Sequence, residues 1–224
     1  LMESDMQETL VADIFDEVDE ELKQDNTKQL WDRYGRYIVG VAILIVLVTA
    51  GHVGWKKYVE DRQEGYSGQF MKALFLSGDK RHTEAAAVLA QLSEDASGGY
   101  STLARFREAV ERAAAGDKSA AADIYDAIAD DGGGDSLYQG LAVLNAVLLR
   151  IDDGDPTKMI ADLTPYATLK SPWRHTAGEL IAVLALRSGD VAKAKEGYQK
   201  LADDLDAPQG ARARATEVLR TLSK

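Results

Sequence analysis

Residues 37–55, YIVGVAILIVLVTAGHVGW, are nineteen consecutive residues without an Asp, Glu, Lys or Arg side chain. As a helix they cover roughly 28 Å, which is about the thickness of the hydrocarbon core of a bilayer. Their centre, residues 41–48, holds only Val, Ala, Ile and Leu. Such a helix has no polar face, unlike an amphipathic helix of a soluble protein. The sequence therefore predicts a membrane-spanning anchor over residues 37–57.

The flanks of this stretch also fit a membrane helix. Tyr34 and Trp55 are aromatic residues of the kind found at bilayer interfaces. Arg36, Lys56 and Lys57 can reach the lipid headgroups. The alternatives are a buried helix of a soluble core and a cleaved signal peptide. Charges at both ends argue against the first, and thirty-six preceding residues argue against the second, because signal peptides begin with a short basic segment.

Residues 1–36 are acidic, with eleven Asp or Glu and four Lys or Arg. Apolar residues recur among them at steps of three and four, which predicts an amphipathic helix of about four turns. An anionic membrane surface would repel the acidic face of this helix, so we expect its apolar stripe to bind a protein. The alternative is an acidic tail without fixed structure. The candidate partner-binding residues are Leu10, Ile14, Phe15, Val18 and Leu22.

Composition restricts the fold and the function of residues 58–224. This stretch is long enough for one domain with a sizeable core. It is rich in Ala, and every proline of the chain lies at or after Pro156, which favours helices. The net charge of −11 argues against nucleic-acid binding, because phosphate contacts need clustered Lys and Arg. The lack of cysteine excludes disulfides, thiolate metal ligands and cysteine nucleophiles.

A repeat of Gly-Asp pairs organises the same stretch. Four such pairs each follow an apolar run, at spacings of 38, 38 and 35 residues. A period in this range predicts a solenoid of stacked helices. We expect each Gly to take the left-handed conformation that ends one helix, and each Asp to cap the next helix. The four pairs are Gly78-Asp79, Gly116-Asp117, Gly154-Asp155 and Gly189-Asp190.

Small and aromatic residues follow two of these pairs at the same distances. Ala121 and Tyr125 stand five and nine residues after Gly116, and Ala194 and Tyr198 stand at the same offsets after Gly189. Such residues let paired helices pack closely, as in a tetratricopeptide repeat, which this pattern resembles. Asp155-Pro156 and Ser171-Pro172 are predicted helix starts. Glycines 132–134 are predicted to form a loose joint between the second and third repeats. Helices are expected over residues 58–77, 83–95, 101–115, 118–129, 136–151, 156–166, 172–188, 191–205 and 208–222.

Little in the sequence points to catalysis. His52, His82 and His175 lie far apart and in no metal-ligand spacing, and the sequence contains no GxSxG, HExxH or Walker A motif. We therefore predict a protein that is not an enzyme, with no catalytic residues, cofactor, metal site or small-molecule substrate. Aromatic residues at helical spacing are candidates for a helical core or, less often, for a peptide groove. They are Tyr66, Phe70, Phe106, Tyr125, Tyr138, Trp173 and Tyr198.

Four short stretches carry a resemblance to a known family. They are IFDEVDEELKQDNTKQLWDRYGR at residues 14–36, GWKKY at 54–58, SPWR at 171–174 and APQG at 207–210. In these stretches the chain resembles a family of membrane-anchored, tetratricopeptide-like bacterial proteins, in the form found in alphaproteobacteria. The members of this family are ancillary subunits of the Sec translocon. The resemblance covers nearly the whole chain and implies an all-α fold, with one N-terminal transmembrane helix before a tetratricopeptide-like α-solenoid.

The resemblance also implies a place in the cell. It implies a cytoplasmic N-terminus, a single span in the bacterial inner membrane and a periplasmic C-terminal domain. The Lys and Arg counts beside the anchor, four before it and three after it, are nearly balanced and barely decide the orientation. The expected domains are an acidic cytoplasmic segment at residues 1–36, the anchor at 37–57 and the repeat domain at 58–224.

Two functions of different classes are consistent with this arrangement. The first is a non-enzymatic, chaperone-like protein-binding module that assists newly exported proteins. The resemblance implies that its partners are the Sec translocon and a membrane-anchored periplasmic chaperone of the prolyl-isomerase class. The alternative is an architectural accessory subunit of another inner-membrane complex.

Overall fold

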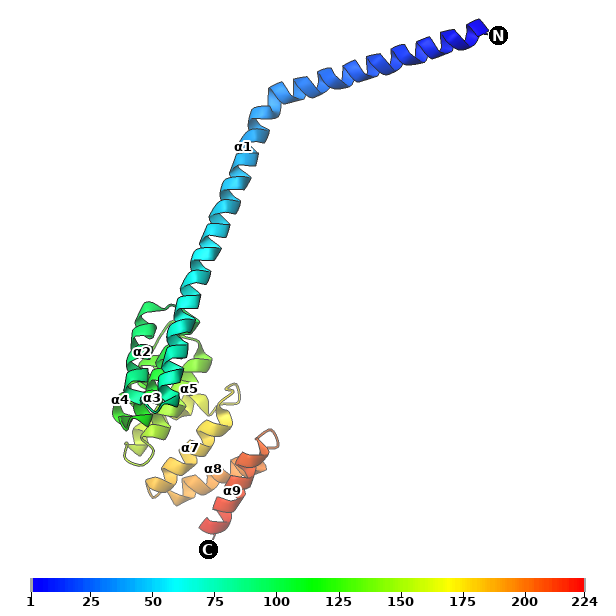
Figure 1. Cartoon of the computed structure of the whole chain (residues 1–224). Coiled ribbons are helices and arrows are strands. Elements are labelled where there is room, and N and C mark those ends of the chain that lie inside the picture. Colours follow the sequence, from blue (N-terminus) through cyan, green and yellow to red (C-terminus); the bar gives the residue numbers. More distant parts are fainter. Residues whose placement is uncertain (1, 224) are drawn as a thin grey trace. The chain divides into compact units, whose positions relative to one another are not determined.

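The computed structural model describes the backbone of residues 2–223 and the side chains of Trp31 and of residues 33–223. The regular elements of this part of the chain are all helices, and it contains no strand (Figure 1). The predicted all-α fold is therefore confirmed. The chain divides after Gln63 into two compact units, which are described separately.

Helix α1, Met2–Gly78, runs without interruption through the predicted anchor. The sequence-based prediction treated residues 2–78 as separate segments. No proline precedes Pro156, so nothing in the sequence forces a break. The segment Arg33–Gly78 contains an apolar stretch long enough to cross a membrane, and none of that stretch is buried. The alternative of a buried soluble-core helix is therefore wrong.

The predicted partner-binding stripe lies within α1, where the backbone is helical. The side chains of Leu10, Ile14, Phe15, Val18 and Leu22 lie outside the described residues. Their role in binding stays a prediction.

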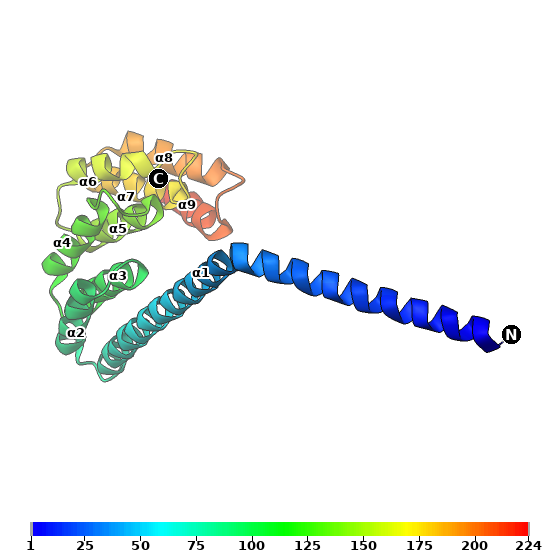
Figure 2. The same cartoon turned by 90° about the horizontal axis from the view of Figure 1, so that it is seen from above.

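The second unit contains the end of α1 and the helices that follow it. From α2 onward each helix packs against the next, and Figure 2 shows α4 and α5 between the α2–α3 pair and the later helices. The bounds agree with the predicted ranges to within a few residues. They are α2 His82–Asp95, α3 Gly99–Ala114, α4 Lys118–Ala129, α5 Ser136–Leu149, α6 Pro156–Leu163, the 3₁₀ helix η1 Thr164–Tyr166, α7 Arg174–Arg187, α8 Val191–Asp203 and α9 Gln209–Leu222.

Two of the Gly-Asp turns have the predicted geometry. Gly116 and Gly189 take left-handed φ values of 94° and 83°. Asp117 Oδ1 accepts a hydrogen bond from Ala120 N at 3.1 Å, and Asp190 Oδ1 accepts one from Lys193 N at 3.0 Å. At the third pair the cap is present, because Asp155 accepts from Thr157 N at 2.9 Å, but Gly154 is not left-handed.

The first Gly-Asp pair and the Ser171-Pro172 start depart from the prediction. Lys80, with φ 61°, takes the left-handed position in place of Gly78, and Arg81, the N-cap residue of α2, makes no side-chain capping hydrogen bond. Helix α7 begins at Arg174 rather than at Pro172. Residues 171–174 instead form a turn, in which Arg174 N donates to Ser171 O at 3.3 Å and Trp173 N donates to Ser171 Oγ at 3.1 Å.

The buried positions of four helices lie at the same distances from the turn residue that precedes each helix. In each of the helices α2, α4, α6 and α8, the residues five and nine positions after the turn residue are buried. The turn residues are Lys80, Gly116, Gly154 and Gly189. The predicted close packing after Gly116 and Gly189 is thus confirmed, and it extends to the other two turns. The buried pairs are Ala85 and Leu89, Ala121 and Tyr125, Met159 and Leu163, and Ala194 and Tyr198.

The buried apolar side chains of the described residues form four clusters in chain order. The first joins α1 to α2 and α3, and the next three are centred on α4, α6 and α8. Helices α3, α5 and α7 each contribute to two neighbouring clusters. Each repeat is therefore stabilised by its nearest neighbours, as in other solenoids.

Candidate protein-binding groove

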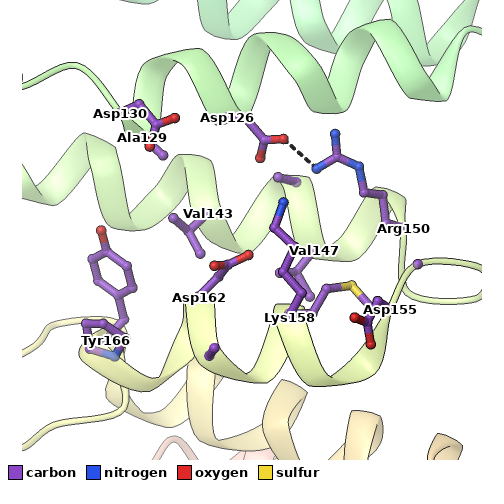
Figure 3. Close-up of a pocket in the computed structure, with 15 residues that line it drawn as sticks. Asp126, Ala129, Asp130, Val143, Val147, Arg150, Asp155, Lys158, Asp162 and Tyr166 are labelled. Atoms are coloured by element: carbon purple, nitrogen blue, oxygen red, sulfur yellow. Dashed lines mark hydrogen bonds and ion pairs between the residues drawn. The ribbon is translucent and has the colours of Figure 1, made fainter.

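A groove of about 540 Å³ lies between α4, α5 and α6, and we refer to it as the α4–α6 groove (Figure 3). Its floor is apolar: half-buried Val143 and buried Val147 come from α5, and buried Met159 comes from α6. Exposed Ala161 and Pro165 continue this lining on the α6 side. The volume falls in the usual range of ligand sites in proteins.

Charged side chains line the walls of the groove. Arg150, at the end of α5, donates to Asp126 Oδ2 at 2.7 Å (Figure 3). It also donates to Asp123 Oδ1 at 2.9 Å. The charge of this arginine is therefore neutralised by α4. Asp155 is engaged as the cap of α6.

Two carboxylates and a phenol also line the groove. Asp130 comes from the C-terminus of α4, and the hydroxyl of Tyr166 points toward that end of α4, whereas Asp162 of α6 lies between Tyr166 and Lys158 (Figure 3). Burial raises the pKa of the Tyr166 hydroxyl, so it stays neutral at pH 7. Among the described side chains, none forms an ion pair or a hydrogen bond with the carboxylate of Asp130 or Asp162.

A glycine in α5 lets Tyr166 and Trp173 sit directly on that helix. A Cβ atom on Gly140 would lie 2.5 Å from Trp173 Cδ1 and 2.9 Å from Tyr166 Cδ1. The Trp173 indole Nε1 also donates to Leu137 O at 3.0 Å. These contacts position the wall of the groove that Tyr166 provides.

A second hollow of about 420 Å³ lies between α7 and α8. His175 lies on its edge, where its Nε2 is 3.0 Å from Asp204 Oδ2. The backbone N–H of Asp206 and then His175 lower the pKa of the Asp204 carboxyl. These contacts connect α7 to the loop after α8, so His175 is at the edge of the core.

A buried polar network joins α1, α2 and α3. Glu111, 1% exposed, lies with its Oε2 2.7 Å from His82 Nδ1 and its Oε1 2.6 Å from Arg107 Nη2. Arg107 also donates to Ser77 Oγ at 2.9 Å. Desolvation raises the pKa of Glu111, but hydrogen bonds with His82 and Ser77 and the charge of Arg107 outweigh it, so the pKa lies below its ordinary value.

The sequence-based prediction missed this network and the groove. Glu108 and Glu111 follow buried Ala104 at steps of four and seven, so the pattern does place both acids on the core face of α3. Tyr166 was not among the candidate aromatic residues. Tyr125 and Tyr198 from that set are core residues, 5% and 3% exposed. Among the described residues, no three His, Cys, Asp or Glu side chains come together as metal ligands.

Comparison with protein families gives one match. The model of the family described as a tetratricopeptide repeat-like domain matches residues 28–220. Comparisons with curated proteins and with solved structures found no match.

Proposed function

Because this chain belongs to the tetratricopeptide repeat-like domain family, we propose that it is a membrane-anchored, non-enzymatic protein-binding module. Domains of this kind are typically protein-binding modules and not catalysts. The observation that carries the proposal is the double role of α1. Its apolar stretch is exposed throughout, whereas Phe70 and Ala73 near its C-terminus pack into the first core cluster of the repeats.

The partners and location of this module are also part of the proposal. The protein is a single-pass inner-membrane protein with a cytoplasmic segment at residues 1–36, an anchor at 37–57 and a periplasmic repeat domain at 58–224. It is ancillary to the Sec translocon and assists newly exported proteins together with a membrane-anchored periplasmic chaperone. The resemblance of the flanking sequences supports this proposal. The alternative is an architectural subunit of another inner-membrane complex.

Copurification of the full chain in mild detergent distinguishes the Sec-ancillary role from the architectural alternative. Translocon subunits and a chaperone of the prolyl-isomerase class, identified by mass spectrometry, are the expected partners. A fixed stoichiometric complex with other inner-membrane proteins, and no translocon subunit, contradicts the Sec assignment and favours the architectural alternative. A chain carrying the anchor without the repeats is the matched control, because it shows which partners the repeats recruit.

A further inference from the structure

The α4–α6 groove has more negative than positive charge. Four aspartates and two basic side chains line it, for a formal charge of −2. Arg150 is already paired with Asp123 and Asp126, which leaves Lys158 as the cation of the lining without an ion pair in the described structure. The two lining aspartates without a partner among the described side chains are Asp130, at the end of the groove that α4 forms, and Asp162 on α6.

The backbone adds to the negative potential at this end. Helix α4 ends at Ala129, and Asp130 is its C-terminal capping residue. The C-terminus of a helix carries a partial negative charge, which favours cations. The ring of Tyr166 beside it offers a second favourable contact to a Lys or Arg side chain. A cation is the complementary group here.

The apolar part of the groove lining favours an apolar group of the ligand. Half-buried Val143 and exposed Ala161 and Pro165 present apolar surface beside the acidic residues. An apolar side chain placed on them would lose contact with water, which is favourable. A ligand that satisfies both parts of the groove therefore carries an apolar group beside a cationic one.

We propose that the α4–α6 groove binds a segment of a partner protein in which Lys or Arg side chains flank an apolar side chain. One cation pairs with Asp130 and the other with Asp162, and the apolar side chain between them lies on Val143. This inference rests on the proposed protein-binding function and names the chemistry of the partner segment. The matching charges determine which segments bind, because like charges across an interface are costly.

The first test measures binding of three labelled pentapeptides to the full chain in nanodiscs of zwitterionic lipid, with empty nanodiscs subtracted. The peptides are Lys-Ala-Leu-Ala-Lys, Glu-Ala-Leu-Ala-Glu and Lys-Ala-Ser-Ala-Lys. We expect the first to bind most tightly, and its affinity to fall as the salt concentration rises. Equal or tighter binding of the glutamate peptide overturns the proposal.

Matched variants locate the binding. The double variant Asp130→Asn with Asp162→Asn is expected to bind Lys-Ala-Leu-Ala-Lys, the lysine–leucine peptide, roughly threefold to tenfold more weakly than the wild type does. Asp152→Asn with Asp153→Asn, in the exposed turn after α5 and outside the groove lining, is the charge-matched control and should bind like the wild type. Unchanged affinity in the first variant overturns the groove assignment but leaves the proposed function standing, since wild-type copurification tests that function separately.

Crosslinking gives an independent check of position. A photoreactive amino acid in place of Ala161, which lines the groove, should crosslink to the lysine–leucine peptide. The same amino acid in place of exposed Ala192 on α8 should not. Crosslinking at Ala192 alone overturns the assignment even if the affinities follow the expected order.

Discussion

At the scale of single residues, Glu111 shows how a charge is retained inside a small-residue core. Its carboxylate is buried between His82 and Arg107, so ionisation is stabilised by partners rather than by water. The folded-state pKa is lowered, which means that the folded chain releases this proton more readily than the unfolded chain. The contribution of Glu111 to stability is therefore present above its unfolded pKa and is lost as the pH falls through its lower folded pKa.

Replacing this residue should expose that dependence. Glu111→Gln is expected to lower the free energy of unfolding at pH 7 by about 1–3 kcal/mol, because it leaves Arg107 and His82 without their anionic partner. The difference from the wild type should shrink as the pH falls through the lowered pKa of Glu111. Denaturant unfolding in detergent over a series of pH values, followed by circular dichroism, measures it. Glu217→Gln, which removes an exposed ion pair with Arg220, is the control and should change little. A pH-independent difference would contradict this account.

Gly140 is a second residue whose identity follows from a contact. Gly140→Ala should destabilise the repeat domain by roughly 1–3 kcal/mol, because the new methyl overlaps the rigid ring of Trp173. Gly178→Ala in α7 is the matched control, since nothing lies within 4 Å of its added methyl. Alanine is a better helix former than glycine, so the control should be neutral or slightly stabilising. Equal melting temperatures of the two variants would contradict the contact.

At the scale of the helical elements, the same small residue recurs at the crossing of paired helices. Ala121 in α4 and Ala194 in α8 are both 0% exposed. Each stands five residues after a left-handed glycine, so the turn and the crossing are set together. A larger side chain has no space at either position.

Overpacking tests this arrangement. Ala121→Leu and Ala194→Leu should each lower the free energy of unfolding by roughly 1–3 kcal/mol. Ala127→Leu in α4 and Ala192→Leu in α8 are exposed on the same helices and should leave it almost unchanged. Thermal melts of the four variants decide the matter, and four equal melting temperatures would show that the register is wrong.

The N-terminal segment of α1 is an element whose role stays a prediction. Phe15→Asp with Val18→Asp should weaken the association of the chain with its partners, because the apolar stripe would be interrupted by charge. The repeats should keep their thermal stability. Crosslinking and mass spectrometry compare this variant with Asp16→Asn and Glu20→Gln, a change on the acidic face. Retention of every partner in the Phe15 and Val18 variant would favour the acidic-tail alternative.

At the scale of the whole molecule, helix α1 contains the anchor and also the first part of the repeats. We propose that the anchor holds the protein in the membrane and that the repeats bind its partners. Topology is the property to measure first. A reporter enzyme that is active only in the periplasm, fused after Lys224, should be active. A reporter that is active only in the cytoplasm, fused at the same place, is the control and should be inactive. The opposite pair of results, with normal expression, would reverse the proposed orientation.

Features that depend on neighbouring residues could be predicted from the sequence. The exposed apolar stretch, the caps at Asp117 and Asp190, and the buried positions of Tyr125 and Tyr198 were all predictable. Each depends on residues within a few turns of one another, where helix geometry sets the spacing. The unbroken course of α1 could not be predicted, because glycines within a helix permit a break without requiring one.

Contacts between distant residues became apparent only in the folded chain. Glu111 meets His82, and Trp173 lies on Gly140. Both contacts connect residues about thirty positions apart, and the groove likewise draws its walls from α4, α5, α6 and η1. Such contacts depend on how one repeat stacks on the next. That stacking is set by the fit of whole helix faces, which no local spacing in the sequence records.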